Sequence, residues 1–440
     1  MPKNLLFLAW PQVTEGLLTV VAQVADMFWA GRLGYQAVAG LGVGQIYILM
    51  TLTARAGMDA AMRAMIARAI GARQISHANH VLLQALALTA LFSLFIAVTG
   101  IALSEQMLRV LGLGDEVVRQ ANAYMQIMFI AIGGFFFQSM SAGALQAAGD
   151  SLTPLKAETV ARIIHFVLSP LLVLGLFGMP ELGLAGISLA MLAGRSVGIS
   201  MNFFALFRGH TRLRLDIREF RPDVPLMGRM LKIGLPASVT GAQRGISQLV
   251  LVAMVAPFGD GAVAAFAVAR RVETMANQTS VGIGKAAGAL AAQNLGAGNA
   301  DRAMPTVKCA IAYMAIVGGI LCTFFFLFPG KVAAFFHSDA QFIDAATTWI
   351  LIVALGFLPL SVGYVLDHVF NTVGKPTIPM LVTVATLWGI EIPLSYVLSH
   401  HTPLAQYGLP WALVIGSTIR LVILAAYLRN GKWRRVGATV

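Results

Sequence analysis

The chain has 440 residues, of which 58% are apolar and only 11% are charged, and its mean hydropathy is +0.78. Soluble domains carry about 25% charged residues, so this composition excludes a disordered chain, a basic nucleic-acid-binding domain and almost every soluble enzyme. The 31 basic residues exceed the 19 acidic ones, and two cysteines, Cys309 and Cys322, cannot supply a disulfide framework. The sequence predicts an integral membrane protein.

A helix that crosses a bilayer needs about 20 mostly apolar residues, and twelve such segments follow one another along the chain. In chain order they lie near residues 5–30, 38–68, 80–104, 118–147, 156–178, 182–207, 226–256, 262–292, 305–329, 343–372, 377–399 and 405–428. The loops between them are too short for a soluble catalytic domain. We therefore expect an all-α integral membrane protein with twelve transmembrane helices, and not an enzyme.

Basic residues gather on one side of the predicted membrane, as is typical of cytoplasmic loops. If the N-terminus is cytoplasmic, the inner side holds most of the loop charges, including Arg63 and Arg162. The outer side then keeps four: Arg32, Arg109, Arg119 and Lys331. This asymmetry predicts a multi-pass protein of the plasma or inner membrane with both termini in the cytoplasm.

The second half of the sequence matches the first at a constant offset of 225 residues. Matched pairs include Pro11 with Pro236, Gly57 with Gly282, Gly149 with Gly374, and Arg195 with Arg420. Six spans in each half make this a parallel repeat, an arrangement that many transporters use for alternating access. We expect two six-helix bundles, residues 1–207 and 226–428, with a basic cytoplasmic linker at 208–225 and a cytoplasmic tail at 429–440.

Three motifs resemble those of the multidrug and toxic compound extrusion (MATE) transporters. They are Trp10-Pro11 with VADMFWAGRLG at 24–34, LQAAGDSLTP at 145–154, and QNLGAGN at 293–299. The resemblance covers essentially the whole chain. It implies a secondary active antiporter that exports organic, often cationic and aromatic compounds in exchange for H⁺ or Na⁺. Apart from the coupling ion we expect no cofactor and no metal site.

Asp26 is a carboxylate within the first span, where a charge costs about 2.5–3.5 kcal/mol on insertion scales. The resemblance matches Asp26 to the first-span aspartate of the family and implies a cation-coupling site. On the fifth span, Ser169 and His165 replace an aspartate and an asparagine of one family branch. We predict that His165 is a second titrating group, because imidazole changes charge near physiological pH. The alternatives are a structural aspartate and a neutral core histidine.

In the second half, Arg244 stands near the position where another family branch has a glutamate. An arginine there would repel a cationic substrate unless a carboxylate neutralises it, and Glu273, Asp367 and Glu391 are the candidates. We predict that Asp367 is a further cation-coupling residue, because it lies in mid-span beside a helix break. Arg244 and Glu273 are expected to bind substrate. A purely structural ion network around Glu273 is the alternative.

Aromatic and amide side chains are the remaining candidates for a substrate pocket. Tyr47, Gln138 and Tyr364 could line a site for flat aromatic compounds, because cations bind well to ring faces, although most aromatic residues of a bundle belong to its core or face lipid. The expected partners are the lipid bilayer and a small organic substrate, without nucleic acid, and the chain is expected to act as a monomer. Two other functions stay open: a lipid-linked oligosaccharide flippase of the same wider superfamily, and a non-transporting membrane scaffold or channel.

Overall fold

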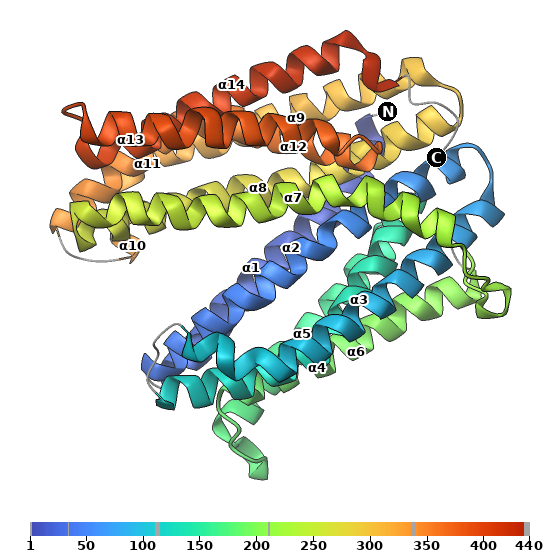
Figure 1. The fold of residues 1–440 in the computed structure, drawn as a ribbon, viewed down its shortest axis with the longest axis horizontal. Coiled ribbons are helices and arrows are strands. Elements are labelled where there is room, and N and C mark those ends of the chain that lie inside the picture. The colour runs from blue at the N-terminus through green and yellow to red at the C-terminus, as the bar shows by residue number, and fades with distance from the viewer. Residues whose placement is uncertain (1, 34, 111–114, 210–211, 337–339, 435–440) are drawn as a thin grey trace. The chain divides into compact units, whose positions relative to one another are not determined.

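The computed structural model describes residues 2–33, 35–110, 115–209, 212–336 and 340–434 (Figure 1). Within these ranges the regular elements are all helices. Gly34 of the first motif, residues 210–211 of the predicted linker and residues 435–440 of the predicted tail lie outside the described residues.

Both halves of the chain are built from long helices. The first half contains α1 (Pro2–Arg32), α2 (Tyr35–Gly71), α3 (Ile75–Arg109), α4 (Asp115–Ala148), α5 (Leu152–Leu174) and α6 (Leu184–Arg208). The second half contains α7 (Val224–Val255), α8 (Asp260–Gly296), α9 (Ala300–Leu327), the short α10 (Pro329–Phe336), α11 (Ala340–Thr372), α12 (Thr377–Thr383), α13 (Ile392–His400) and α14 (Gly408–Asn430). A π-helix, Val384–Glu391, joins α12 to α13 in one span.

Ten of the described helical segments are long and apolar enough to cross a membrane. Helices α2 and α8, each 37 residues long, occupy the positions of the second and eighth predicted spans. They are also partners in the 225-residue repeat, since α2 ends at Gly71 and α8 ends at Gly296. The prediction of an all-α membrane protein with twelve spans in two bundles is confirmed.

The chain folds into two compact units. We call Thr14–Leu235 the N-terminal lobe, and Met1–Val13 together with Pro236–Val440 the C-terminal lobe. In the N-terminal lobe α4 packs against α2, α3 and α6, α2 packs against α3, and α5 packs against α6 (Figure 1). In the C-terminal lobe α11 packs against α8, α9 and α14, α8 packs against α9, and α13 packs against α14. The repeat in sequence is therefore a repeat of helix packing.

The two units divide beside the matched prolines, within α1 after Pro11 and within α7 at Pro236. The bundles predicted from the spans and the linker, residues 1–207 and 226–428, have different limits from these two units. Gly57 and Gly282, which the repeat matches, permit close backbone contacts beside both divisions. A Cβ on Gly282 would lie 2.6 Å from the Val13 nitrogen, and a Cβ on Gly234 would lie 2.6 Å from the Gly57 carbonyl oxygen. No larger residue fits such a distance without moving a helix.

The segment that leads into α7 is fastened to α3. Asp223, just before α7, accepts a hydrogen bond from the backbone N–H of Leu226 (2.9 Å), as an N-cap residue does. Its other carboxylate oxygen lies 3.2 Å from His80 Nε2. Gln84 of α3 accepts from the Asp223 N–H and donates to the Arg221 carbonyl. The Leu226 N–H and then His80 lower the pKa of the Asp223 carboxyl.

Asp223→Ala should lower the melting temperature of the purified protein by a few degrees at pH 6, because α7 loses its N-cap. A carboxyl group with a lowered folded-state pKa stabilises the fold above its unfolded-state pKa and loses that effect as pH falls through the folded-state value. The difference between the two proteins should therefore shrink below about pH 4. Thermal scans from pH 3 to pH 7 measure it.

Asp216→Ala is the matched control in the same linker. Asp216 caps only a three-residue 3₁₀ turn, through the Arg218 N–H, so its replacement should change the melting temperature much less. Equal effects of the two substitutions would contradict the role given to Asp223.

Candidate functional site

Asp26 of α1 and His165 of α5 lie together in the interior of the N-terminal lobe. Both are almost fully buried, at 1% and 2% exposure. Asp26 Oδ1 lies 3.1 Å from His165 Nε2, close enough for an ion pair. Neither of these atoms, nor His165 Nδ1, has a hydrogen-bond partner of standard geometry in the described part of the chain. The hydroxyl of Ser169, one turn beyond His165, is also buried without such a partner. This is a polar pair that an added proton or cation could satisfy.

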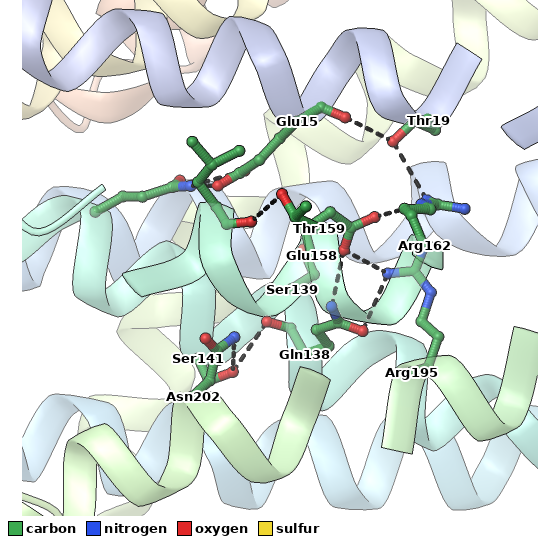
Figure 2. A network of polar contacts seen from close by, with 12 residues as sticks. Glu15, Thr19, Gln138, Ser139, Ser141, Glu158, Thr159, Arg162, Arg195 and Asn202 are labelled. Atoms are coloured by element: carbon green, nitrogen blue, oxygen red, sulfur yellow. Dashed lines mark hydrogen bonds and ion pairs between the residues drawn. The ribbon is translucent and has the colours of Figure 1, made fainter. Parts of the chain in front are cut away.

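A second polar centre of the N-terminal lobe surrounds Glu158 of α5 (Figure 2). Glu158 accepts hydrogen bonds from Arg162 Nε (2.7 Å) and Gln138 Nε2 (2.8 Å), and Arg195 of α6 approaches it at 3.4 Å. Arg162 also donates to the Thr19 hydroxyl of α1. Two guanidinium groups thus share one buried carboxylate, which leaves this centre with one excess positive charge.

Arg162 and Arg63 were expected among exposed loop charges, and that expectation is wrong. Both are buried inside helices, at 5% and 6% exposure. Arg63 of α2 pairs with Asp59 one turn earlier (2.9 Å) and donates to Gln146 of α4, which in turn donates to Glu15 of α1. Each has a carboxylate at the i−4 position of its own helix, Asp59 for Arg63 and Glu158 for Arg162, and can therefore lie inside the lobe.

Asp367 of α11 forms the corresponding centre of the C-terminal lobe. One carboxylate oxygen, Oδ2, accepts hydrogen bonds from Arg244 of α7 (2.5 Å) and from Arg420 of α14. Both guanidinium groups lie over the ring of Tyr364, at 4.7 and 5.3 Å from its centre. Of the three carboxylates that the sequence offered as partners of Arg244, Asp367 is the one that forms an ion pair with it. As around Glu158, two arginines share one buried carboxylate.

A polar cavity of about 230 Å³ opens beside this centre, within the C-terminal lobe. Arg244, Tyr364 and Arg420 line it together with Arg270 and Glu273 of α8 and Glu391 at the end of the π-helix. Glu273 pairs with Arg270 and accepts a hydrogen bond from the Tyr364 hydroxyl (3.0 Å). Four of the predicted residues are therefore neighbours in space: Arg244, Glu273, Tyr364 and Asp367.

The other predicted residues divide between two environments. Gln138 belongs to the Glu158 centre, where it also accepts a hydrogen bond from Arg195. Tyr47 does not: it packs against an apolar cluster, and its hydroxyl donates to the Met107 carbonyl. Within the described ranges no three His, Cys, Asp or Glu side chains gather as metal ligands.

Sequence reasoning missed Glu158 and gave no role to Arg195 and Arg420. The signal was present, because Arg195 and Arg420 are matched by the 225-residue repeat and each stands in the middle of an apolar span. A charge repeated at that depth requires a buried partner in both lobes. The partners themselves are not matched by the repeat, since Glu158 lies on α5 and Asp367 on α11.

Comparisons with known proteins agree with this architecture. The family model MatE matches residues 11–171 and 236–397, one copy in each half of the chain. The chain is 26% identical over 421 residues to the probable multidrug resistance protein YoeA of Bacillus subtilis, covering 95% of this chain and 91% of YoeA. It is 24% identical to the FAD transporter of Shewanella oneidensis, covering 86% of this chain and 84% of that protein.

Solved structures share the fold. An outward-facing multidrug resistance MATE family transporter of the MOP superfamily superimposes with a TM-score of 0.93 at 21% identity, over 99% of this chain and 97% of that one. With two repeats of the family model spanning most of the sequence and long apolar helices in both lobes, the chain belongs to the MatE (multidrug and toxic compound extrusion) family of transporters.

Proposed function

We propose that the protein is a secondary active antiporter that exports organic compounds, often cationic and aromatic, in exchange for H⁺. The observation that carries this proposal is the buried contact between Asp26 and His165. The family membership makes the chain a transporter, and relatives such as YoeA, named as a probable multidrug resistance protein, support organic substrates.

The Asp26–His165 pair suits a proton better than a metal cation. A hard cation such as Na⁺ prefers several oxygen ligands, whereas an imidazole nitrogen facing a carboxylate takes up a proton and becomes its counter-ion. Uptake of the proton turns a neutral imidazole beside a carboxylate into an ion pair. Because a buried ion pair needs further hydrogen bonds to be stable, protonation would change how the Asp26 and His165 side chains are held between α1 and α5.

Export follows if the proton and the substrate favour opposite states of the transporter. A ligand shifts a conformational equilibrium only by its difference in affinity for the two states, and the coupling is reciprocal. Substrate binding in the inward-facing state and proton binding in the outward-facing state would then drive each other's release. We propose that the chain does this as a monomer in the plasma or inner membrane, with both termini in the cytoplasm.

Everted membrane vesicles that contain the protein test this function. A fluorescent cationic dye should accumulate when an inward-acid pH gradient is imposed, and Asp26→Asn should abolish the gradient-driven part of the uptake. His165→Gln should strongly reduce that part. Glu105→Gln is the matched control, since Glu105 is an exposed carboxylate paired with Arg109 on α3, and it should leave uptake unchanged.

Three outcomes would contradict the proposal. Dye levels that do not depend on any gradient would remove the antiport function. A response to a Na⁺ gradient but not to pH would replace H⁺ with Na⁺ as the coupling ion. Unchanged pH-driven uptake by His165→Gln would leave Asp26 without its proposed partner.

A further inference from the structure

The linker between α6 and α7, together with the first turns of α7, carries a dense group of basic residues on the N-terminal lobe. Residues 208–232 contain seven basic and three acidic residues. The seven basic side chains are all exposed: Arg208, Arg212, Arg214, Arg218, Arg221, Arg229 and Lys232. None of them forms an ion pair with another residue that the structure describes. We call these seven residues the basic surface.

The aspartates of the linker do not neutralise the basic surface. Asp216 accepts a hydrogen bond from the backbone N–H of Arg218 (3.0 Å). Asp223 accepts one from the backbone N–H of Leu226, and its second oxygen contacts His80 instead of an arginine. Both carboxylates therefore cap backbone turns, and the basic surface keeps an excess of positive charge.

The linker is fastened to the lobe, so its arginines have a fixed arrangement. Leu213 and Leu215 are buried, at 0% and 3% exposure. The backbone N–H of Arg214 donates a hydrogen bond to Asn79 Oδ1 of α3 (3.0 Å; Figure 1). Side chains alternate between two sides in extended backbone. Burial of the two leucines therefore turns Arg212 and Arg214 away from the lobe.

Exposed apolar side chains stand among the basic ones. Ile217, Phe220 and Val224 are 62%, 36% and 72% exposed. Basic residues mixed with exposed apolar ones are typical of segments that lie in a membrane interface, where the apolar groups enter the lipid and the charges meet phosphates. Because α6 ends and α7 begins at this surface, it lies where membrane-spanning helices leave the bilayer.

An open cavity of about 790 Å³ adjoins the linker. His80, which contacts Asp223, lines this cavity together with Arg73 and His77. Arg73 is exposed and adds a further cation beside the basic surface. The cavity thus gives a charged headgroup room next to the linker.

We propose that the basic surface binds anionic phospholipids of the surrounding bilayer, with their phosphate groups at the arginines and their acyl chains beside Ile217, Phe220 and Val224. Arginine suits this role because its guanidinium group offers paired N–H donors to a phosphate. A soluble polyanion would match the charges but would leave the apolar side chains in water. Bound lipid would hold the start of α7, the helix that continues into the C-terminal lobe at Pro236.

Native mass spectrometry of the delipidated full-length protein tests the proposal. The probes are phosphatidylglycerol and phosphatidylcholine with the same acyl chains, of which only the first carries a net negative charge. Phosphatidylglycerol should bind about tenfold or more tightly, because each Lys or Arg near an anionic lipid surface strengthens attachment about fivefold. Raising the ammonium acetate concentration from about 0.1 to about 1 M should remove most of this preference, since salt screens exposed charges.

A triple substitution of the linker should remove the preference for the anionic lipid. Arg212→Gln, Arg214→Gln and Arg218→Gln together should lower the affinity for phosphatidylglycerol about tenfold or more and leave that for phosphatidylcholine unchanged. The same three arginines replaced by lysine keep the charge and should retain much of the preference. All three side chains are exposed, so the fold should tolerate both variants.

A matched control removes three exposed arginines at the opposite end of the same helices. Arg32 ends α1, Arg109 ends α3, and Arg119 lies in the first turns of α4. Their joint replacement by glutamine should leave the lipid preference unchanged. Ile217→Ser with Phe220→Ser should weaken binding of both lipids about tenfold, because the acyl chains lose their apolar contacts.

Equal affinity of the wild type for the two lipids would overturn the proposal. So would a preference that the triple glutamine variant of the linker keeps, that the control variant loses to the same extent, or that high salt leaves unchanged. Displacement of phosphatidylglycerol by equimolar glycerol 3-phosphate would assign the surface to free phosphates, and displacement by hexaglutamate would assign it to an acidic protein segment. Either result would contradict lipid binding. Because these measurements use no ion gradient, their outcome is independent of the proposed antiport.

Discussion

Replacing Asp367 with Asn should lower the free energy of unfolding by about 3–5 kcal/mol, the cost of removing one partner from a buried ion pair. The substitution keeps the shape of the side chain but removes the negative charge that Arg244 and Arg420 share. Two guanidinium groups over one tyrosine ring would then repel each other in a poorly hydrated interior. Denaturant titration in mixed micelles, followed by tryptophan fluorescence, measures the change.

Arg420→Gln provides the matched comparison within the same centre. It should cost clearly less than Asp367→Asn, because Asp367 still pairs with Arg244 and no charge is left without a counter-ion. The double substitution should recover part of the stability that Asp367→Asn loses, since only one unpaired guanidinium then remains. A change below about 1 kcal/mol for Asp367→Asn, the value of an exposed pair, would show that the centre is hydrated.

Gly194→Ala should destabilise the N-terminal lobe by about 1–3 kcal/mol, the usual cost of adding a methyl group to a filled interior. Gly194 lies on α6 where that helix meets α5, and a Cβ there would stand 2.2 Å from the Ala161 carbonyl oxygen. The two helices would have to separate. Because α5 carries Glu158, Arg162 and His165, gradient-driven dye uptake should fall together with stability.

Gly319→Ala of α9 is the control for that substitution, since a Cβ at Gly319 would meet no other atom within 4 Å. There the change should be neutral or should stabilise the protein by up to about 1 kcal/mol, because alanine restricts the unfolded chain more than glycine does. The two substitutions are chemically identical, so their opposite signs would come from packing alone. The same sign at both positions would contradict the close contact of α5 and α6.

The fold was predictable because its main signals are periodic and local. Apolar length sets the spans, and the repeat sets the number of helices in each half, so the twelve helices were predicted from residue types alone. The repeat also indicated Gly57 and Gly282, whose place in the lobes explains why small residues stand there. What the spans could not indicate is that the lobes divide inside α1 and α7, because such a division depends on contacts between segments far apart in the sequence.

The candidate sites were predictable only in part. Asp26 and His165 were named one by one, as polar residues in apolar spans, and the structure brings them to 3.1 Å. Glu158 was missed and Arg162 was placed in a loop, because a charge pair one helical turn apart on a single helix looks like the polar edge of a span. Tyr47 was predicted from residue type, which does not tell whether an aromatic side chain faces a cavity or a core.

The sequence by itself determined the class of protein, through a composition that is 58% apolar and 11% charged. Its apolar segments determined the number of spans, and the constant offset of 225 residues determined the repeat. These properties follow from the solvent, since a bilayer imposes length and apolarity on each helix separately. Only the tertiary structure decided which of the few charges meet. Arg244, Asp367 and Arg420 are separated by 123 and 53 residues along the chain, and they form one centre because three helices pack around it. Charge pairing in a membrane interior depends on distances of a few ångströms, which local sequence does not specify.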